Sequence, residues 1–106
     1  MSEPGKPDVT PASGPAIGDN AALQRFELQL DGATAFVSYR RTADAVWLTH
    51  AEVPAALRGR GLGDLLVRGV LERLRAQGDK IVAQCPFVAV YIQRHPEFAP
   101  LLASRP

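Results

Sequence analysis

The sequence has little cysteine and no long apolar run. Cys85 is the one cysteine among 106 residues, which excludes an intramolecular disulfide framework and a zinc site built from several cysteines. Nowhere do about 18 apolar residues follow one another, so we expect no membrane-spanning helix. Residues 1–6 lack the apolar stretch of a secretion signal. We therefore expect a reducing compartment, the cytoplasm.

The sequence also has no excess of charge of either sign. Lys and Arg number 12 and Asp and Glu number 11, a formal net charge of +1. There is no long basic run, and the aromatic residues do not alternate with basic ones as they do in an RNA-stacking surface. We expect no nucleic-acid partner. The two histidines, His50 and His95, have no metal-ligand spacing, so we expect no metal site.

The first part of the chain is rich in proline and glycine. Residues 1–19 contain Pro4, Gly5, Pro7, Pro11, Gly14, Pro15 and Gly18. Such a composition cannot offset the entropy cost of ordering by burying apolar surface. We expect a disordered tail over 1–19 and one domain over 20–106. A domain of this size buries about 60–65% of its unfolded surface, so we expect a modest core in a monomer or weak homodimer.

The first half of the domain has the pattern of strands. Apolar residues alternate in segments 24–30 and 33–40, and Asp31-Gly32 between them is a strong hairpin signal. A third strand is expected over 45–53. Simple alternation would place Val46, Leu48, His50 and Glu52 on one face and Trp47, Thr49, Ala51 and Val53 on the other. This half is therefore predicted to be an antiparallel meander.

The second half has the pattern of a βαβ unit. After Pro54, apolar residues at helical spacing predict a helix from about Gly61 to Ala76, ended by Gln77-Gly78. Segment 80–85 then reads as a strand parallel to 45–53, and 87–94 as a second helix. The predicted fold class is α+β: an antiparallel meander, a βαβ crossover and a C-terminal helix.

The loop before the first helix has the chemistry of an anion site. It reads Arg58-Gly59-Arg60-Gly61-Leu62-Gly63. Glycines let the backbone approach a ligand closely, and the first N–H groups of a helix are free donors with partial positive charge. A nucleotide-hydrolase loop would need Gly-Lys-Ser/Thr, which is absent, and the glycine spacing does not fit a dinucleotide fingerprint. The remaining pattern is Arg-x-x-Gly-x-Gly.

Together with four further segments, this loop resembles the GNAT superfamily of acetyl-CoA-dependent N-acetyltransferases, and more narrowly its minimal small subfamily. The matching segments are His50-Ala51-Glu52-Val53-Pro54, Arg58-Gly59-Arg60-Gly61, Cys85-Pro86-Phe87, Tyr91 and His95-Pro96-Glu97-Phe98. The resemblance covers about residues 23–102. It implies a GNAT-like fold with acetyl-CoA or coenzyme A as co-substrate and an amine as acceptor.

The resemblance also implies how the donor is bound. The loop would hold the coenzyme A pyrophosphate through backbone N–H groups, and the strand before it would hold the pantetheine arm. The residues expected in this role are Val53, Arg58, Gly59, Arg60, Gly61, Leu62, Gly63 and Asp64. Typical members carry helices between their first two strands, whereas only Asp31-Gly32 stands there in this chain. The acceptor side should therefore be open, to a protein or peptide amine or to a small amine.

Four residues are candidates for the chemistry, and each has a structural alternative. Glu52 or His50 could accept the amine proton, or be a solvated carboxylate and a structural histidine. Cys85 could be an acetylated nucleophile or a buried packing residue, although the family generally transfers directly in a ternary complex. Tyr91 could protonate the leaving thiolate, as the family's tyrosine does, or pack with its hydroxyl bonded. A non-catalytic acyl-CoA-binding module and a protein-interaction module remain alternatives.

Overall fold

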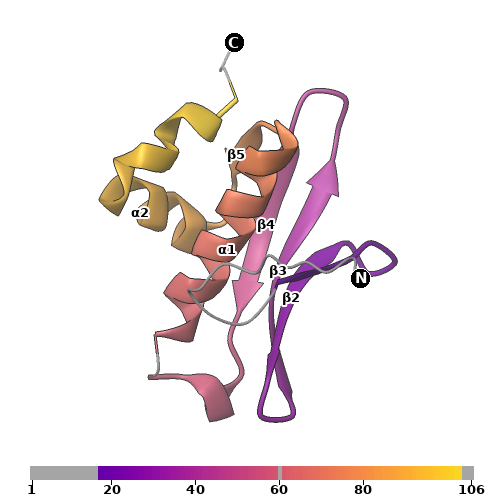
Figure 1. Ribbon diagram of the computed structural model, residues 1–106, viewed down its shortest axis with the longest axis vertical. Helices are drawn as coiled ribbons and strands as arrows, with labels where there is room; N and C mark the ends of the chain where they lie inside the picture. Colours follow the sequence, from indigo (N-terminus) through magenta and orange to yellow (C-terminus); the bar gives the residue numbers. More distant parts are fainter. Residues whose placement is uncertain (1–16, 60, 104–106) are drawn as a thin grey trace, which may run out of the picture.

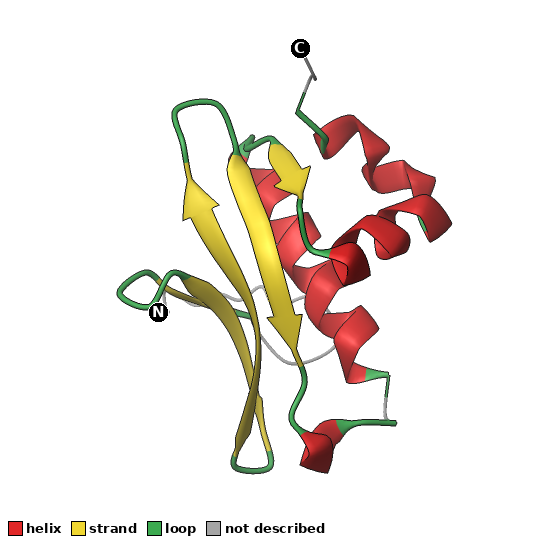
Figure 2. Ribbon diagram, turned by 180° about the vertical axis from the view of Figure 1, so that it is seen from behind, coloured by secondary structure: helices red, strands yellow, loops and turns green. Residues whose placement is uncertain are grey.

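The computed structural model describes residues 17–59 and 61–103 and contains one five-stranded sheet. The strands lie in chain order, β1 (Gly18–Asn20), β2 (Arg25–Leu30), β3 (Ala33–Arg41), β4 (Val46–Glu52) and β5 (Ile81–Ala83). Strands β1 to β4 pair with one another in antiparallel fashion, whereas β5 pairs with β4 in parallel. Figures 1 and 2 show the helices gathered on one face of this sheet.

The hairpin between β2 and β3 forms where Asp31-Gly32 predicts it. Both residues have positive φ, 53° at Asp31 and 77° at Gly32, as a two-residue turn that continues the twist of its strands requires. The paired positions run from Leu30–Ala33 to Arg25–Ser38. The inward residues Phe26, Leu28, Ala35 and Val37 are fully buried. The alternation in the sequence therefore sets the register of this pair.

In the described part of the chain, two α-helices and two 3₁₀ helices accompany the sheet. Helix α1 (Leu62–Gln77) packs its apolar stripe on β2 and β3 and ends at Gly78, whose φ is 79°. Helix α2 (Pro86–Arg94) contacts β4 and β5, η1 (Ala55–Leu57) precedes α1, and η2 (Pro96–Leu101) follows α2. Their buried side chains form one core with the inner face of the sheet, including Leu48, Leu66, Leu71, Ile81, Val88 and Phe98.

The α+β meander, the βαβ crossover and the C-terminal helix are thus confirmed. The predicted element ends shift by one or two residues at most places, and β5 is shorter than the expected 80–85. Its pairing with β4 covers only Val46–Ile81, Trp47–Val82 and Leu48–Ala83. Because β5 ends early, the two strands separate beyond Leu48.

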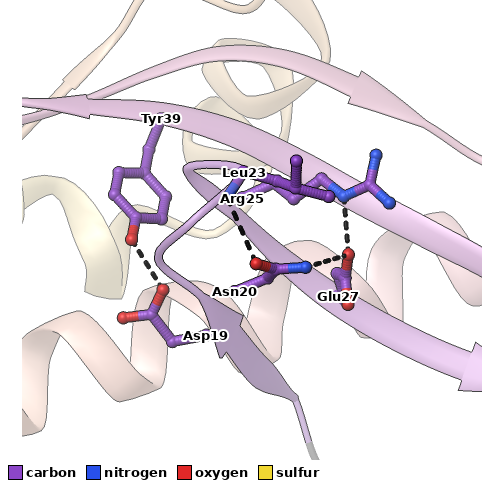
Figure 3. A network of polar contacts seen from close by, with 6 residues as sticks. All are labelled: Asp19, Asn20, Leu23, Arg25, Glu27 and Tyr39. Carbon is purple, nitrogen blue, oxygen red and sulfur yellow. Dashed lines mark hydrogen bonds and ion pairs between the residues drawn. The ribbon is translucent and has the colours of Figure 1, made fainter.

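A short strand at the edge of the sheet was not predicted. Gly18 and Asp19, which we placed in the tail, pair with Glu27 and Phe26 in β2. The Asp19 carboxylate accepts a 2.6 Å hydrogen bond from the Tyr39 hydroxyl (Figure 3). The boundary expected at residue 20 therefore lies too late. The rest of the expected tail, 1–16, lies outside the described residues.

The Asn20 side chain fixes the turn after β1. Its amide nitrogen donates to Glu27 at 3.1 Å, and its oxygen accepts the Leu23 N–H at 3.2 Å (Figure 3). Glu27 also accepts a 2.6 Å hydrogen bond from Arg25 Nε. Asparagine and aspartate in such a turn hydrogen-bond nearby backbone and side-chain groups. Polar contacts therefore join β1 to β2 and β3 where the strand has few apolar side chains.

Candidate functional site

The glycine-rich loop between β4 and α1 is held from both sides. Leu57 in η1 is fully buried and anchors the start of the loop. The Arg58 side chain turns back, and its Nε donates a 2.9 Å hydrogen bond to the backbone oxygen of Val53. This bond ties the loop to the end of β4. Arg60, which we expected to help bind a phosphate, lies outside the described residues.

The backbone of the loop leaves an open helix N-terminus. Gly59 and Gly61 have φ of 79° and 70°, a conformation that favours glycine over all other residues. Gly61 is the N-cap of α1, and no side chain of the described residues caps the helix there. The first intrahelical hydrogen bond runs from the Leu65 N–H to the Gly61 oxygen. The N–H groups of the three residues before Leu65 are therefore available to an anion.

Asp64 lies in this first turn of α1 and is exposed. An acidic residue here suits the helix dipole. Its carboxylate does not cap the helix, however, so it leaves the free N–H groups open. Leu62 points into the core and is 8% exposed, which means that it offers its backbone rather than its side chain to a ligand.

Beyond the loop, the separation of β4 from β5 opens one edge of β4. The Cys85 N–H donates a 2.8 Å hydrogen bond to the Leu48 oxygen, beyond the last paired residues, Leu48 and Ala83. No strand of the described part of the chain pairs with 49–52 on that side. The backbone groups along this edge can accept an extended ligand by sheet-like hydrogen bonding.

Two hollows follow this edge and the loop. One, of about 530 Å³, lies beside the end of β4 and is lined by His50, Ala51, Glu52, Val53, Arg58, Gly63, Leu66 and Phe87. The other, of about 280 Å³, surrounds the loop and is lined by Val53, Leu57, Arg58, Gly59, Gly61, Leu62, Gly63, Asp64 and Phe87. Seven of the eight residues expected to bind the donor line one or both of them. The structure therefore brings the predicted donor residues together.

A β-bulge in β4 changes which side chains lie on each face of the sheet. Ser38 pairs with His50 and Tyr39 pairs with Leu48, so Thr49 is an extra residue with no paired position on β3, although its hydroxyl donates a 3.3 Å hydrogen bond to the Ser38 backbone oxygen. The extra residue reverses the alternation. Val46 and Leu48 are buried, whereas His50 and Glu52 are exposed, and Ala51 now packs against the core. The prediction that all four of Val46, Leu48, His50 and Glu52 share one face is therefore wrong.

After the bulge, His50 and Glu52 lie together on the helix-free face of the sheet. His50 Nε2 and Glu52 Oε1 are 3.4 Å apart, and the side chains are 60% and 54% exposed. The His50 ring also lies 6.2 Å from that of Phe36, its neighbour on β3. A carboxylate at this distance can orient an imidazole by hydrogen bonding. Both candidate bases are thus at the rim of the larger hollow and open to solvent.

Cys85 lies on the other side of the gap between β4 and β5. It is the N-cap residue of α2, and its side chain is 5% exposed within the core. The thiol is free but is not among the residues that line the two hollows. This placement suits the packing alternative, and the role as nucleophile stays a prediction.

Tyr91 lies one helical turn beyond Phe87 in α2 and does not line either hollow. Its ring stacks on His95 with centroids 4.0 Å apart. Its hydroxyl accepts a 3.4 Å hydrogen bond from Arg68, and this contact, with the nearby Glu72 and Glu97 carboxylates, raises the pKa of Arg68. The hydroxyl is bonded, as the structural alternative requires, and proton transfer by Tyr91 stays a prediction.

Phe87 was not among the residues expected to bind the donor, although it ends the matching segment Cys85-Pro86-Phe87. It lines both hollows and is 43% exposed, although it is large and apolar. Its place directly after Cys85-Pro86, at the start of a helix that follows a strand, is the signal that could have indicated it.

Among residues 17–59 and 61–103, no cluster of three or more potential metal ligands occurs. None of the described helices combines the length and the apolar character needed to cross a bilayer.

Comparison with known proteins gives one family. Residues 25–101 of the 106 match the model of the GCN5-related N-acetyltransferases. No curated protein matches the chain. The matched region begins with β2 and ends in η2, so it includes the loop, both hollows and every candidate residue. The chain belongs to the GCN5-related N-acetyltransferase family.

Proposed function

We propose that this protein transfers the acetyl group of acetyl-CoA directly to an amine. The observation that carries the proposal is the uncapped N-terminus of α1, which meets the open edge of β4 at the larger hollow. Free N–H groups suit the pyrophosphate, and the strand edge suits the amide-containing pantetheine arm. The pyrophosphate and the pantetheine arm of one donor molecule would thereby each have a place to bind. Family membership supports acetyl transfer in general.

The reaction needs a group that removes a proton from the attacking amine. The nitrogen forms a bond to the thioester carbonyl carbon, the carbon–sulfur bond breaks, and the amine proton passes to a base while the thiolate takes up a proton. We assign the base to the His50–Glu52 pair, because both side chains lie at the rim of the hollow and face solvent. An acceptor would reach them from the helix-free face of the sheet.

The open face supports an amine presented by a peptide or a small molecule. No helix of the described residues covers this side of the sheet, so no described element there encloses an acceptor (Figure 2). Selection of an acceptor would then depend on the few side chains around His50, such as Phe36 and Glu52.

The test is acetyl-CoA turnover with a panel of amines. Coenzyme A release is measured with a lysine-containing peptide, a polyamine and a small primary amine, and acetylation of the acceptor is checked by mass spectrometry. Loss of a general base lowers a rate by about 100-fold or more, which is the effect expected for the double variant His50→Ala/Glu52→Gln. Asp44→Asn, an exposed carboxylate in the turn before β4, is the matched control and should keep the wild-type rate.

Wild-type turnover equal to that of the double variant would contradict the assignment of the base. Binding of acetyl-CoA without any acetylated acceptor would indicate an acyl-CoA-binding module instead.

A further inference from the structure

We propose that the acceptor carries a carboxylate several bonds away from its amine, and that Arg25 binds this carboxylate. The inference rests on the proposed function, because it takes the His50–Glu52 pair as the place where the amine reacts. It concerns the residues of β2 and β3 that lie beside this pair on the helix-free face of the sheet.

Two rows of paired residues cross the helix-free face beside the proposed base. The rows are Arg25–Ser38–His50 and Glu27–Phe36–Glu52, each with one residue from β2, one from β3 and one from β4. Neighbouring strands lie about 4.8 Å apart, so about 10 Å separates β2 from β4. Arg25 and Glu52 are at opposite corners of this six-residue patch, with Ser38 and Phe36 between them. The patch therefore has a positive corner and a negative corner on either side of an aromatic ring.

The guanidinium of Arg25 is held in one place by its neighbours. Its Cζ lies 4.4 Å from the centroid of the Phe36 ring, and its Nε donates a 2.6 Å hydrogen bond to Glu27. Asn20 holds Glu27 in turn, at 3.1 Å. No hydrogen bond joins the two terminal nitrogens of Arg25 to another described residue, and Figure 3 shows them beyond the Nε contact. An arginine that is fixed in this way can bind a carboxylate with two parallel hydrogen bonds.

The two carboxylates of the patch differ in what they leave for a ligand. The charge of Glu27 is offset by Arg25, and its side chain is only 14% exposed. Glu52 is 54% exposed and lies 3.4 Å from the imidazole of His50. An amine arrives as an ammonium ion, which Glu52 attracts before the proton is removed. The free charge of the patch thus complements an ammonium group at one end and a carboxylate at the other.

The distance between the two corners selects the length of the acceptor. In an α-amino acid the amine and the carboxylate are attached to the same carbon, which is too short to reach from β4 to β2. A chain of several bonds is needed, as in an ω-amino acid or in a lysine side chain near an acidic residue of a peptide. Both sources present the same chemistry to Arg25.

The test compares acceptors that differ only by the carboxylate. The first pair is 5-aminopentanoate and pentylamine, and the ratio of their kcat/KM values is measured with saturating acetyl-CoA. We expect wild type to prefer 5-aminopentanoate about five- to tenfold, as a charge-assisted contact at a partly exposed site contributes, and Arg25→Gln to show no preference. Both acceptors are measured on the same preparation, so a smaller folded fraction lowers both rates and leaves their ratio unchanged.

A second pair distinguishes the source of the carboxylate. It consists of two peptides in which a lysine is followed by aspartate or by asparagine. A larger preference within the peptide pair indicates a peptide acceptor, and a larger preference within the first pair indicates a free ω-amino acid. Arg40→Gln is the matched control, because Arg40 is an exposed arginine of β3 that lies outside the patch. It should keep the ratios of wild type.

The outcomes separate this inference from the proposed function. Wild type that acetylates these amines without preferring a carboxylate contradicts the role of Arg25 and leaves the proposed function standing. A preference that persists in Arg25→Gln, or that Arg40→Gln removes equally, does the same. Wild type that acetylates none of the four acceptors overturns the proposed function and this inference with it.

Discussion

At the scale of single residues, polar side chains act here by fixing neighbours rather than by entering the core. Among the described residues, no polar or charged residue is buried as a whole. Asp19, Asn20 and Glu27 instead hold the edge of the sheet through short hydrogen bonds (Figure 3). Arg58 does the same for the loop, through its bond to Val53. The position of the proposed donor site thus depends on a few contacts at the surface.

Glu27 gives a pH prediction at this scale. Hydrogen bonds from Arg25 and Asn20 hold the pKa of the Glu27 carboxyl below its usual value. A lowered folded-state pKa contributes stability above the unfolded-state pKa and loses it as the pH falls through the folded-state value. Urea unfolding of wild type and Glu27→Gln should therefore differ at pH 7 in favour of wild type, and the difference should disappear in acid. A difference independent of pH would contradict this explanation.

At the scale of elements, β1 is a small strand that is attached to α1 as well as to β2. Ile17, directly before β1, packs against Gly69 of α1, and its carbonyl oxygen accepts a 2.8 Å hydrogen bond from Arg73. These contacts cross the edge of the sheet and join its first strand to the helix that carries the anion site. We infer that β1 contributes to the stability of the domain despite its three residues.

Replacement of Ile17 tests this contribution. Ile17→Ala removes a half-buried side chain that packs on the core, so we expect a loss of about 1–2 kcal/mol in the free energy of unfolding. The control is Leu23→Ala in the following turn, where the side chain is 58% exposed and the change should stay within about 0.5 kcal/mol. Equal effects of the two substitutions in urea unfolding would show that β1 is not anchored through Ile17.

The elements differ in how far the sequence could predict them. The Asp31-Gly32 hairpin and α1 carry strong local signals, a turn dipeptide and a helical stripe, and both form as expected. The strand Gly18–Asn20 has no apolar alternation in its sequence. It is held instead by hydrogen bonds that join Asp19 to Tyr39 and Asn20 to Glu27, and by the neighbouring Ile17. Strands of this kind depend on the tertiary structure and leave no pattern in the sequence.

The candidate site likewise contains features that the sequence could predict and features that it could not. The loop could be identified because glycine spacing and the helix after it are local features. The side of the sheet on which His50 and Glu52 lie could not be predicted, since the bulge at Thr49 arises in the pairing of β4 with β3. The contact of Gly63 with Phe87 joins two helices that are distant in the chain, so no local pattern could indicate it.

At the scale of the whole molecule, the domain is a single layer of sheet with helices on one side (Figures 1 and 2). The proposed donor site lies where β4, α1 and α2 meet, and the acceptor would approach from the side that the helices leave open. Because donor and acceptor would use different sides of the strand β4, both can be bound at the same time. The architecture therefore fits direct transfer in a ternary complex.

We propose above that the glycine loop binds acetyl-CoA, and titration calorimetry with acetyl-CoA measures this binding. Gly61→Ala disfavours the φ of 70° at the N-cap of α1, so we expect the free loop to relax and ligand binding to have to restore this conformation, at a cost that corresponds to about tenfold in affinity. Gly32→Ala introduces the same kind of strain in the hairpin, where φ is 77°, and is the matched control. Our account predicts that wild type and Gly32→Ala bind acetyl-CoA alike and that Gly61→Ala binds about tenfold more weakly. No binding by wild type, or equal affinity of Gly61→Ala and wild type, would contradict it.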